Sequence, residues 1–358
     1  MNSGTTVADK IALRIRHNQK GYFSTLGISV TNRCTLNCAH CIRGSTAHSS
    51  QMDTKILSGI IDGIPCVKRL VNQVAITGGE PFLFKDAIHR ITEAARSSEI
   101  KTSVVTSAYW ARSPAAARET VRSFPWIDKF SISTDLYHQS KVPLSTIRRA
   151  YDAAKAEGRL VRICVTVNSR NSEEEKAMLA GISEFAYDAD IRVQELLPWG
   201  RAIDKYSGPI SSRVPPIPCI STGPFISELG VIYPCCGPLV TVPSRTALQE
   251  TLDHSLYNSL NRVKLNPLFH FLRIWGFGPL FERLSIAGFS SLLPREHLPV
   301  TPCSTCAALF SVDEINEYLL GLSKDYEFLL EVVAGSVHIM EDNTLLDAYF
   351  PCEERLAK

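Results

Sequence analysis

The stretch CTLNCAHC, residues 34–41, carries three cysteines in a C-x3-C-x2-C pattern directly after an apolar, strand-like segment at residues 26–30. Three thiolates at this spacing can occupy three corners of an iron–sulfur cluster, whereas the usual set of four cysteines fills every corner. One iron would then keep an open coordination position. Open positions are typical of metal sites that carry out a reaction, so the pattern predicts a catalytic iron–sulfur site.

Two other interpretations of this stretch stay open. Structural zinc sites favour paired C-x2-C spacings, and here the fourth ligand would have to come from a distant part of the chain. Cysteine without a metal is often simply a small, buried core residue. The tight spacing favours the cluster over both alternatives.

The composition indicates an ordinary globular protein. The chain has 358 residues, of which 45% are hydrophobic and 21% charged, and this length suffices for one large α/β domain and a smaller module. Its net charge of +2 gives no electrostatic reason to expect nucleic acid or an anionic membrane as a partner.

The chain shows no secretion or membrane signal. Residues 1–20 contain no apolar run typical of a signal peptide, and the most apolar region, residues 267–294, is interrupted by charges and glycines. We therefore expect packed helices in that region and no membrane span. Eleven cysteines without a secretion signal favour metal ligation or redox chemistry in the reducing cytoplasm.

Strand and helix signals alternate along the first half of the chain. Apolar, β-branched runs predict strands at residues 26–30, 71–77, 102–106, 130–133, 161–167 and 191–197. Amphipathic stretches predict helices at residues 54–63, 85–97, 114–123, 143–157 and 172–187. Asp53 and Ser172 are suitable N-caps, and Gly158 is a suitable C-cap.

Six β/α repeats with short links predict parallel strands joined by right-handed crossovers. Six strands are fewer than the eight of a closed barrel, so we expect an α/β fold with an open, partial (β/α)6 barrel. Reactive groups should then gather at the carboxyl ends of the strands. Unusual residues do follow all six predicted strands, at residues 34–41, 78–81, 107–110, 135–138, 168–170 and 198–201.

The tetrapeptide that follows the second predicted strand is Gly78-Gly79-Glu80-Pro81. A double glycine lets the backbone approach a ligand where a Cβ would clash. Glu80 can supply a charge near a ligand ammonium, and Pro81 fixes the turn that follows. The alternative is an ordinary strand-to-helix turn, but the neighbouring cysteine run favours a binding role.

These two motifs together resemble the radical S-adenosylmethionine (SAM) superfamily. The resemblance covers residues 22 to about 200 and depends on the cysteine run and on Ile76-Thr77-Gly78-Gly79-Glu80-Pro81, in this order and at the ends of the first two strands. It implies a 4Fe–4S cluster on Cys34, Cys38 and Cys41, with the amine and carboxylate of SAM on the fourth iron. It also implies that Ser133 and Asp135 contact the ribose or methionyl group, although both residues also suit turns and helix caps.

The resemblance implies the initiating chemistry as well. A reductant such as flavodoxin or ferredoxin delivers an electron, SAM is cleaved to methionine and a 5'-deoxyadenosyl radical, and this radical removes a hydrogen atom from a substrate C–H bond. The protein then has to hold that bond close to the radical and exclude water.

A second set of cysteines lies in the last third of the chain, at Cys219, Cys235-Cys236 and Cys303-x2-Cys306. A hairpin-like segment at residues 225–234, with Gly230 at its turn, precedes the cysteine pair. Four thiolates would fill every corner of a cluster, although zinc also binds a distant pair together with C-x2-C.

This region resembles the twitch domain, a shortened SPASM module that holds an auxiliary 4Fe–4S cluster. Cys219, Cys235, Cys303 and Cys306 match its ligands, and Cys236 is an adjacent extra cysteine. The spacing fits Cys235 and Cys236 equally, and we choose Cys235 because it follows Tyr233-Pro234 at the end of the hairpin. Because no second set of four cysteines follows, we expect one auxiliary cluster. The expected organisation is an N-terminal extension at 1–21, a barrel at 22–205, an auxiliary-cluster domain at 206–320 and a helical tail at 321–358.

Several further residues are candidates for substrate handling, namely Tyr109, Tyr137, His138, Asn168, Arg170 and Glu195. His138 or Glu195 could accept the proton that leaves in an oxidation, although packing, capping or exposure is the alternative for each residue. Cys164 lies in an apolar strand and is expected in the core. Cys66 and Cys352 belong to neither set, and Cys352 is either a free thiol or a hydrogen donor.

Three functions are compatible with these features. We expect first the oxidation or rearrangement of a small molecule of the aminocyclitol or sugar type in natural-product biosynthesis. The second is crosslinking or epimerisation of a ribosomal peptide, against which the 33 residues before Cys34 are too few for a winged peptide-recognition module. The third is a non-catalytic iron–sulfur or electron-transfer protein, in which residues 78–81 would have no purpose.

Overall fold

The computed structural model describes residues 23–168, 172–206, 217–221, 223–243, 245–294 and 301–351. The predictions for the N-terminal extension at 1–21, for Arg170 and for Cys352 therefore lie outside the described residues.

A nine-stranded sheet in the order β6-β5-β4-β3-β2-β1-β7-β8-β9 runs through the described part of the chain. Its first six strands are parallel and neighbour one another in chain order. They are β1 (Thr25–Thr31), β2 (Gln73–Gly78), β3 (Lys101–Thr106), β4 (Lys129–Thr134), β5 (Leu160–Val167) and β6 (Asp190–Glu195). The sheet does not close on itself, and the predicted α/β class with an open, partial barrel is confirmed.

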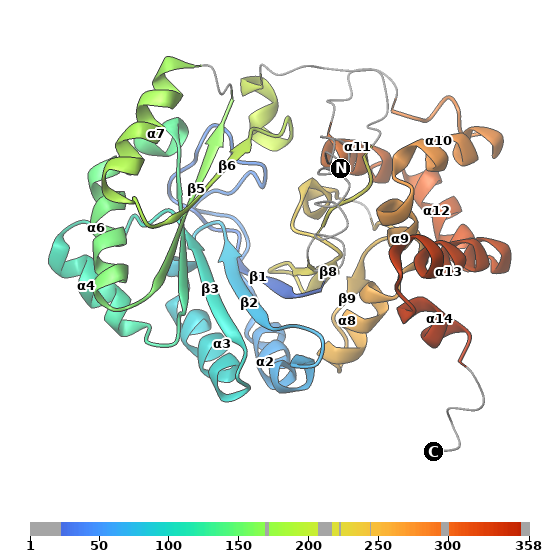
Figure 1. Cartoon of the computed structure of the whole chain (residues 1–358), viewed down its shortest axis with the longest axis horizontal. Helices are drawn as coiled ribbons and strands as arrows, with labels where there is room; N and C mark the ends of the chain where they lie inside the picture. The colour runs from blue at the N-terminus through green and yellow to red at the C-terminus, as the bar shows by residue number, and fades with distance from the viewer. Residues whose placement is uncertain are drawn as a thin grey trace, which may run out of the picture.

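Helices connect the parallel strands and lie along the outer side of the sheet (Figure 1). They are α2 (Thr54–Gly63), α3 (Lys85–Ser97), α4 (Pro114–Ser123), α6 (Leu144–Ala156) and α7 (Glu173–Phe185). A further short helix, α5 (Leu136–Gln139), which was not predicted, follows the end of β4. The predicted N-caps are present, because Asp53 accepts a hydrogen bond from the Lys55 amide and Ser172 accepts one from the Glu175 amide. Gly158 follows α6 with a φ of +68°, a backbone conformation that favours glycine at a helix end.

The core of the barrel lies between the sheet and these helices. Ile28 pairs with Ile76 across β1 and β2, and Ile132 pairs with Ile163 across β4 and β5. All four side chains are fully buried. β-branched side chains pack well on a pleated surface, which explains why these runs form strands and not helices.

Three short strands extend the sheet beyond β1. They are β7 (Phe225–Ile226), which is parallel to β1, and β8 (Val231–Tyr233) and β9 (Glu250–Thr251), which are antiparallel. Gly27 permits this addition, because a Cβ there would lie 2.8 Å from the Phe225 ring. The β7–β8 hairpin, predicted with Gly230 at its turn, packs Ile226 and Ile232 against the barrel core and Phe225 and Tyr233 against a second core.

The second core is formed mainly by helices that gather beside β8 and β9 (Figure 1). They are α9 (Pro267–Ile274), α10 (Phe277–Ile286), α11 (Pro302–Phe310), α12 (Asp313–Leu322), α13 (Tyr326–Met340) and α14 (Thr344–Tyr349). The preceding helix, α8 (Leu256–Lys264), packs Leu256, Leu260 and Val263 against the barrel core instead. Phe269, Phe271 and Leu280 are buried in it, as expected for packed helices in the apolar region 267–294. Within the described residues, no helix is both long enough and apolar enough to cross a membrane.

Candidate functional site

The three clustered cysteines lie on the loop that leaves the carboxyl end of β1. Backbone hydrogen bonds hold the loop at both ends, from the Asn32 amide to the Ser50 carbonyl at 2.7 Å and from the Cys34 amide to the Thr46 carbonyl at 2.9 Å. Cys34 and Cys38 also pack against the barrel core. Burial, the largest cause, raises the pKa of the Cys34 thiol to about 11, and the negative charges of Glu80, Cys38 and Cys41 add to it.

The double glycine after β2 lies against this cysteine loop. A Cβ on Gly78 would lie 2.1 Å from the Thr31 carbonyl oxygen, and one on Gly79 would lie 2.3 Å from that of Arg33. The Gly79 and Glu80 amides donate to these same two oxygens at 2.7 and 2.8 Å. We expected the glycines to allow close approach of a ligand, but the approach that the structure reveals is to the backbone leading into the cysteines.

The Glu80 carboxylate is buried at the ends of β2 and β3. It accepts hydrogen bonds from the Thr106 hydroxyl at 2.8 Å, the Ser107 hydroxyl at 2.6 Å and the Ser107 amide at 2.9 Å. The Phe82 amide donates to it as well, at 3.2 Å. Burial nevertheless dominates and raises its pKa, because these donors only partly compensate for the lost water. A cation placed beside Glu80 would relieve this cost.

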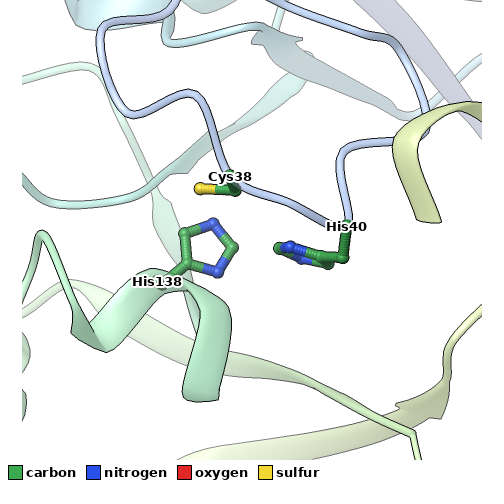
Figure 2. Close-up of side chains that lie close together, drawn as sticks. All are labelled: Cys38, His40 and His138. Atoms are coloured by element: carbon green, nitrogen blue, oxygen red, sulfur yellow. The ribbon is translucent and has the colours of Figure 1, made fainter. Parts of the chain in front are cut away.

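A buried carboxylate, Asp135, joins two histidines at the end of β4. It caps α5 by accepting hydrogen bonds from the Tyr137 and His138 amides. Its Oδ2 atom lies 3.1 Å from His40 Nε2 and 2.8 Å from His138 Nδ1. Figure 2 shows both imidazoles beside Cys38, and one ligand atom from each of Cys38, His40 and His138 lies within 4.8 Å of the others.

The charges of this group support one another. Burial disfavours the Asp135 carboxylate, but the hydrogen bonds from His138 and His40 outweigh it and lower the pKa of Asp135. Burial likewise lowers the pKa of His138, but its hydrogen bonds to Asp135 and Cys38 outweigh that effect and raise the pKa to about 10. The raised pKa favours the protonated form of His138, and its role as a proton acceptor stays a prediction.

The remaining predicted barrel residues follow their strands as expected, but they lie in different surroundings. Ser133 is half-buried on β4, and Glu195 is exposed at the end of β6. The Asn168 side chain donates to the Lys205 carbonyl at 2.7 Å, and the Tyr137 ring stacks on His40 with 4.7 Å between centroids. Sequence reasoning missed His40 as a member of the site, although its position inside the cysteine run was a signal.

A buried ion pair ties the cysteine loop to the β7–β8 hairpin. Arg43 Nη2 lies 2.6 Å from Glu228 Oε2, and Arg43 Nε donates to Asn32 Oδ1 at 3.3 Å. Glu228 also accepts hydrogen bonds from the Ser29 and Ser50 hydroxyls. The hairpin therefore contacts both the strand before the cysteines and the loop after them.

The second set of cysteines comes together beyond the hairpin. Cys219 donates its amide to the Leu272 carbonyl of α9, Cys235 follows β8, and Cys303 and Cys306 lie on α11. A Cβ on Gly237 would lie 3.5 Å from Cys235 Sγ and 3.9 Å from Cys303 Sγ. Burial, and after it the nearby thiols, raises the pKa of Cys235 and Cys306 well above the ordinary value and that of Cys303 to about 12.

The other cysteines differ from this set. The thiols that raise the pKa of Cys306 are Cys235, Cys219 and Cys303. Cys236 is not among them, although its thiol does raise the pKa of Cys235 and Cys303. Cys164, expected in the core, is only half-buried on β5, and Cys66 is exposed.

The chain is similar to one protein family and to a protein with a peptide-related name. Residues 28–151 match the family described as the Radical SAM superfamily. The "Putative peptide biosynthesis protein YydG" of Bacillus subtilis (strain 168) is 21% identical over 317 residues, which are 85% of this chain and 98% of that protein.

Two solved structures share the fold. The structure titled "Native anSMEcpe with bound AdoMet and Cp18Cys peptide" has a TM-score of 0.53 at 14% identity and covers 88% of this chain and 98% of that one. Streptococcus suis SuiB bound to the precursor peptide SuiA has a TM-score of 0.50 at 15% identity, over 74% of this chain and 70% of that one.

Proposed function

Because this chain is an enzyme with a radical SAM superfamily domain, we propose that it modifies a ribosomally made peptide by removing a hydrogen atom from one of its C–H bonds. The observation that carries the proposal is the similarity to YydG, which extends over nearly the whole length of that putative peptide biosynthesis protein. This similarity favours a peptide substrate, our second hypothesis from the sequence, over the aminocyclitol or sugar substrate that we expected first. Crosslinking and epimerisation are the two reactions to distinguish.

A 4Fe–4S cluster and SAM are the cofactors of this family, and together they supply a 5'-deoxyadenosyl radical. In the proposed site, Cys34, Cys38 and Cys41 hold the cluster. The donor set fits, because a cluster would compensate for the mutual repulsion of three thiolates on one partly buried loop.

The chain's own residues would position SAM along the same rim. The Glu80 carboxylate is buried and lacks a cationic partner among its hydrogen-bond donors, so it suits the methionyl ammonium. Residues 78–81, Ser133 and Asp135 would line the ligand. In this arrangement Asp135 keeps His40 and His138 next to Cys38. His138 and Glu195 remain the candidates for moving a proton.

We further propose that Cys219, Cys235, Cys303 and Cys306 hold one auxiliary 4Fe–4S cluster in a twitch/SPASM-like domain at residues 206–320, between the barrel at 22–205 and a tail at 321–358. The second core brings the segments that carry these cysteines together, and the resemblance to the twitch domain favours a cluster over zinc.

Two proposals concern the surroundings of the enzyme. The thiol-rich sites require a reducing compartment, which supports a cytoplasmic location. A flavodoxin or ferredoxin would supply the electron for SAM cleavage. Neither nucleic acid nor a membrane has a part in this proposal.

The test uses anaerobically reconstituted protein and short peptides encoded beside its gene. We expect about eight irons per chain and, with dithionite, conversion of SAM to 5'-deoxyadenosine. A peptide labelled with deuterium should transfer the label to 5'-deoxyadenosine. With unlabelled peptide, loss of two hydrogens then indicates a crosslink, whereas an unchanged mass in H2O and a gain of one deuterium in D2O indicate epimerisation.

Two outcomes would contradict the proposal. Deuterium transfer from labelled aminocyclitols or sugars, with none from any neighbouring peptide, would restore the small-molecule reading. An iron-loaded protein that neither binds nor cleaves SAM would instead support the non-catalytic, electron-transfer reading.

A further inference from the structure

The segment that leaves β6 lies against the cysteine loop of the first site. Arg201, in the short helix Gly200–Lys205, donates from Nε to the Cys38 carbonyl at 3.0 Å. Its Nη1 and Nη2 atoms both lie 3.1 Å from the Ser45 carbonyl, and its own amide donates to the Cys41 carbonyl at 3.2 Å. Arg201 thus hydrogen-bonds the backbone of two predicted cluster ligands and also that of Ser45, which follows them in the loop.

The preceding residue, Gly200, allows this approach. Its φ is +60°, and a Cβ on it would lie 2.4 Å from the Ile42 carbonyl oxygen. Any other residue would be strained in this conformation and would push the segment away from the loop. The backbone of residues 200–201 therefore packs directly on residues 41–42.

The next residue back, Trp199, anchors the segment on the opposite side. Its indole nitrogen donates to the Thr241 hydroxyl at 2.5 Å, and its ring packs against the second core. Thr241 belongs to the short helix Pro238–Thr241, which directly follows Cys235 to Gly237. Arg201 is consequently held by contacts on both sides and cannot simply follow a loop that moves.

The loop needs such support because it has no regular secondary structure between residues 34 and 45. Every residue fixed in an irregular conformation costs conformational entropy, and local hydrogen bonds such as that from Cys41 to Cys38 are few. An arginine is well suited to replace them. Its guanidinium stays charged, and its planar fork binds two acceptors with fixed geometry.

We propose that Arg201 is a positioning residue of the first cysteine site. With Gly200 and Trp199 it forms a clamp, residues 199–201, that holds the carbonyls of Cys38, Cys41 and Ser45 so that the three thiols keep the spacing for a cluster. This inference rests on the proposed function, because it assumes that Cys34, Cys38 and Cys41 hold the cluster.

The test compares Arg201→Gln and Arg201→Lys with Arg33→Gln in the full chain. Arg33 is the matched control, because its Nε also donates to a carbonyl of the same loop, that of Ser49 at 3.1 Å, but from the exposed side. Reconstituted proteins are exposed to an iron chelator. Loss of each cluster is followed by electron paramagnetic resonance and by iron content.

Arg201→Gln should lose the first cluster about tenfold faster than the wild type, since outer partners of metal ligands typically change affinity by this factor or more. Arg201→Lys should lose the first cluster at a rate between those of Arg201→Gln and the wild type. Arg33→Gln should lose it at the wild-type rate, and all variants should lose the second cluster as the wild type does. If Arg201→Gln does not fold, Arg201→Lys and Trp199→Phe, which removes only the indole donor, provide the same comparison with smaller effects.

One result would contradict the clamp alone, and another would contradict both the clamp and the proposed function. Equal rates and unchanged spectra in the Arg201 variants of an iron-loaded enzyme would overturn the clamp and leave the proposed function intact. A wild-type protein that binds no cluster through Cys34, Cys38 and Cys41 would overturn both.

Discussion

The two cysteine sites of this protein are assembled in opposite ways. The first is a single loop, residues 34–41, in which the chain itself fixes the order and spacing of the thiols. The second draws its thiols from three segments, around Cys219, after β8 and on α11, which meet only when the C-terminal helices pack. In a contiguous loop the sequence fixes the spacing of the ligands along the chain. In a dispersed site the distances between the ligands depend on the surrounding tertiary structure.

The surroundings of the two sites differ in the same sense. The first loop lies at the rim of the sheet and is held from outside, by residues 199–201 and by the Arg43–Glu228 pair. In the second site, as in the first, the thiols raise one another's pKa, but the segments that carry them are held by the packing of the C-terminal helices. We therefore expect that the first site can be emptied without disturbing the second.

The largest expected effect is on the first site alone. Replacing Cys34, Cys38 and Cys41 together by Ala should abolish SAM cleavage and reduce the iron content from about eight to about four. Quantifying 5'-deoxyadenosine and iron after anaerobic reconstitution checks both numbers. Cys66→Ala is the control, because this exposed thiol belongs to neither set. SAM cleavage that survives the triple replacement would mean that the reaction starts elsewhere.

The next effect tests the dispersed site with two adjacent residues. Cys235→Ala should remove about four irons, because Cys235 is the thiol of the pair that raises the pKa of Cys306, whereas Cys236 does not act on Cys306. Cys236→Ala should keep them all. SAM cleavage without substrate should survive in both variants, because the first site does not share these ligands. Loss of iron from Cys236→Ala and not from Cys235→Ala would reverse the assignment.

The contrast between local and dispersed features also explains what the sequence could predict. All six parallel strands and the five predicted helices between them lie within a few residues of their predicted positions, since periodicity and caps such as Asp53 are local signals. The gathering of the first site at the strand ends follows from parallel topology alone. The cysteine spacing of the loop is likewise encoded within eight residues.

Contacts between distant segments could not be predicted in this way. The pairing of β7 with β1 requires Phe225 to lie on Gly27, and nothing near either residue indicates it. His40 contacts Asp135, and the Cys38 carbonyl accepts a hydrogen bond from Arg201. Both partners are similarly remote in sequence. Side-chain partners at such separations are set by tertiary packing, so a strand-end position identifies a candidate but not its contact.

A third prediction concerns the ion pair that joins the two regions. Glu228→Gln should lower the free energy of unfolding by about 3 kcal/mol, because it leaves the largely buried Arg43 without its counterion. Urea unfolding of the iron-loaded protein measures this. Arg43→Met combined with Glu228→Gln should be less harmful than the sum of the two single changes.

The exposed pair Lys68–Glu99 provides the control for this ion pair. Glu99→Gln should leave the free energy of unfolding nearly unchanged, because both side chains of that pair are solvated. Equal effects of Glu228→Gln and Glu99→Gln would show that the hairpin is not anchored through this contact.

The smallest predicted effect concerns a buried histidine of the second region. His270 on α9 is buried, and its Nε2 lies 2.8 Å from the Lys264 carbonyl, which only a protonated nitrogen can bind. The charged groups that act on it are Arg273, Lys264 and Asp342. Burial, the largest cause, lowers the pKa of His270 from 6.5 to about 4, whereas Asp135 and Cys38 raise that of His138 in the first region.

The sign of the pH effect follows from which state binds the proton. Between pH 6.5 and 4 the unfolded chain protonates this histidine and the folded chain does not, so His270 makes the free energy of unfolding fall as the pH falls. At pH 5 the loss is about 2 kcal/mol relative to pH 7. His270→Gln keeps a donor for the Lys264 carbonyl but does not titrate, so its stability should fall by about 2 kcal/mol less over this interval. Urea unfolding at pH 7 and pH 5 measures the difference between variant and wild type, and equal losses in the two proteins would mean that His270 is not held neutral in the second core.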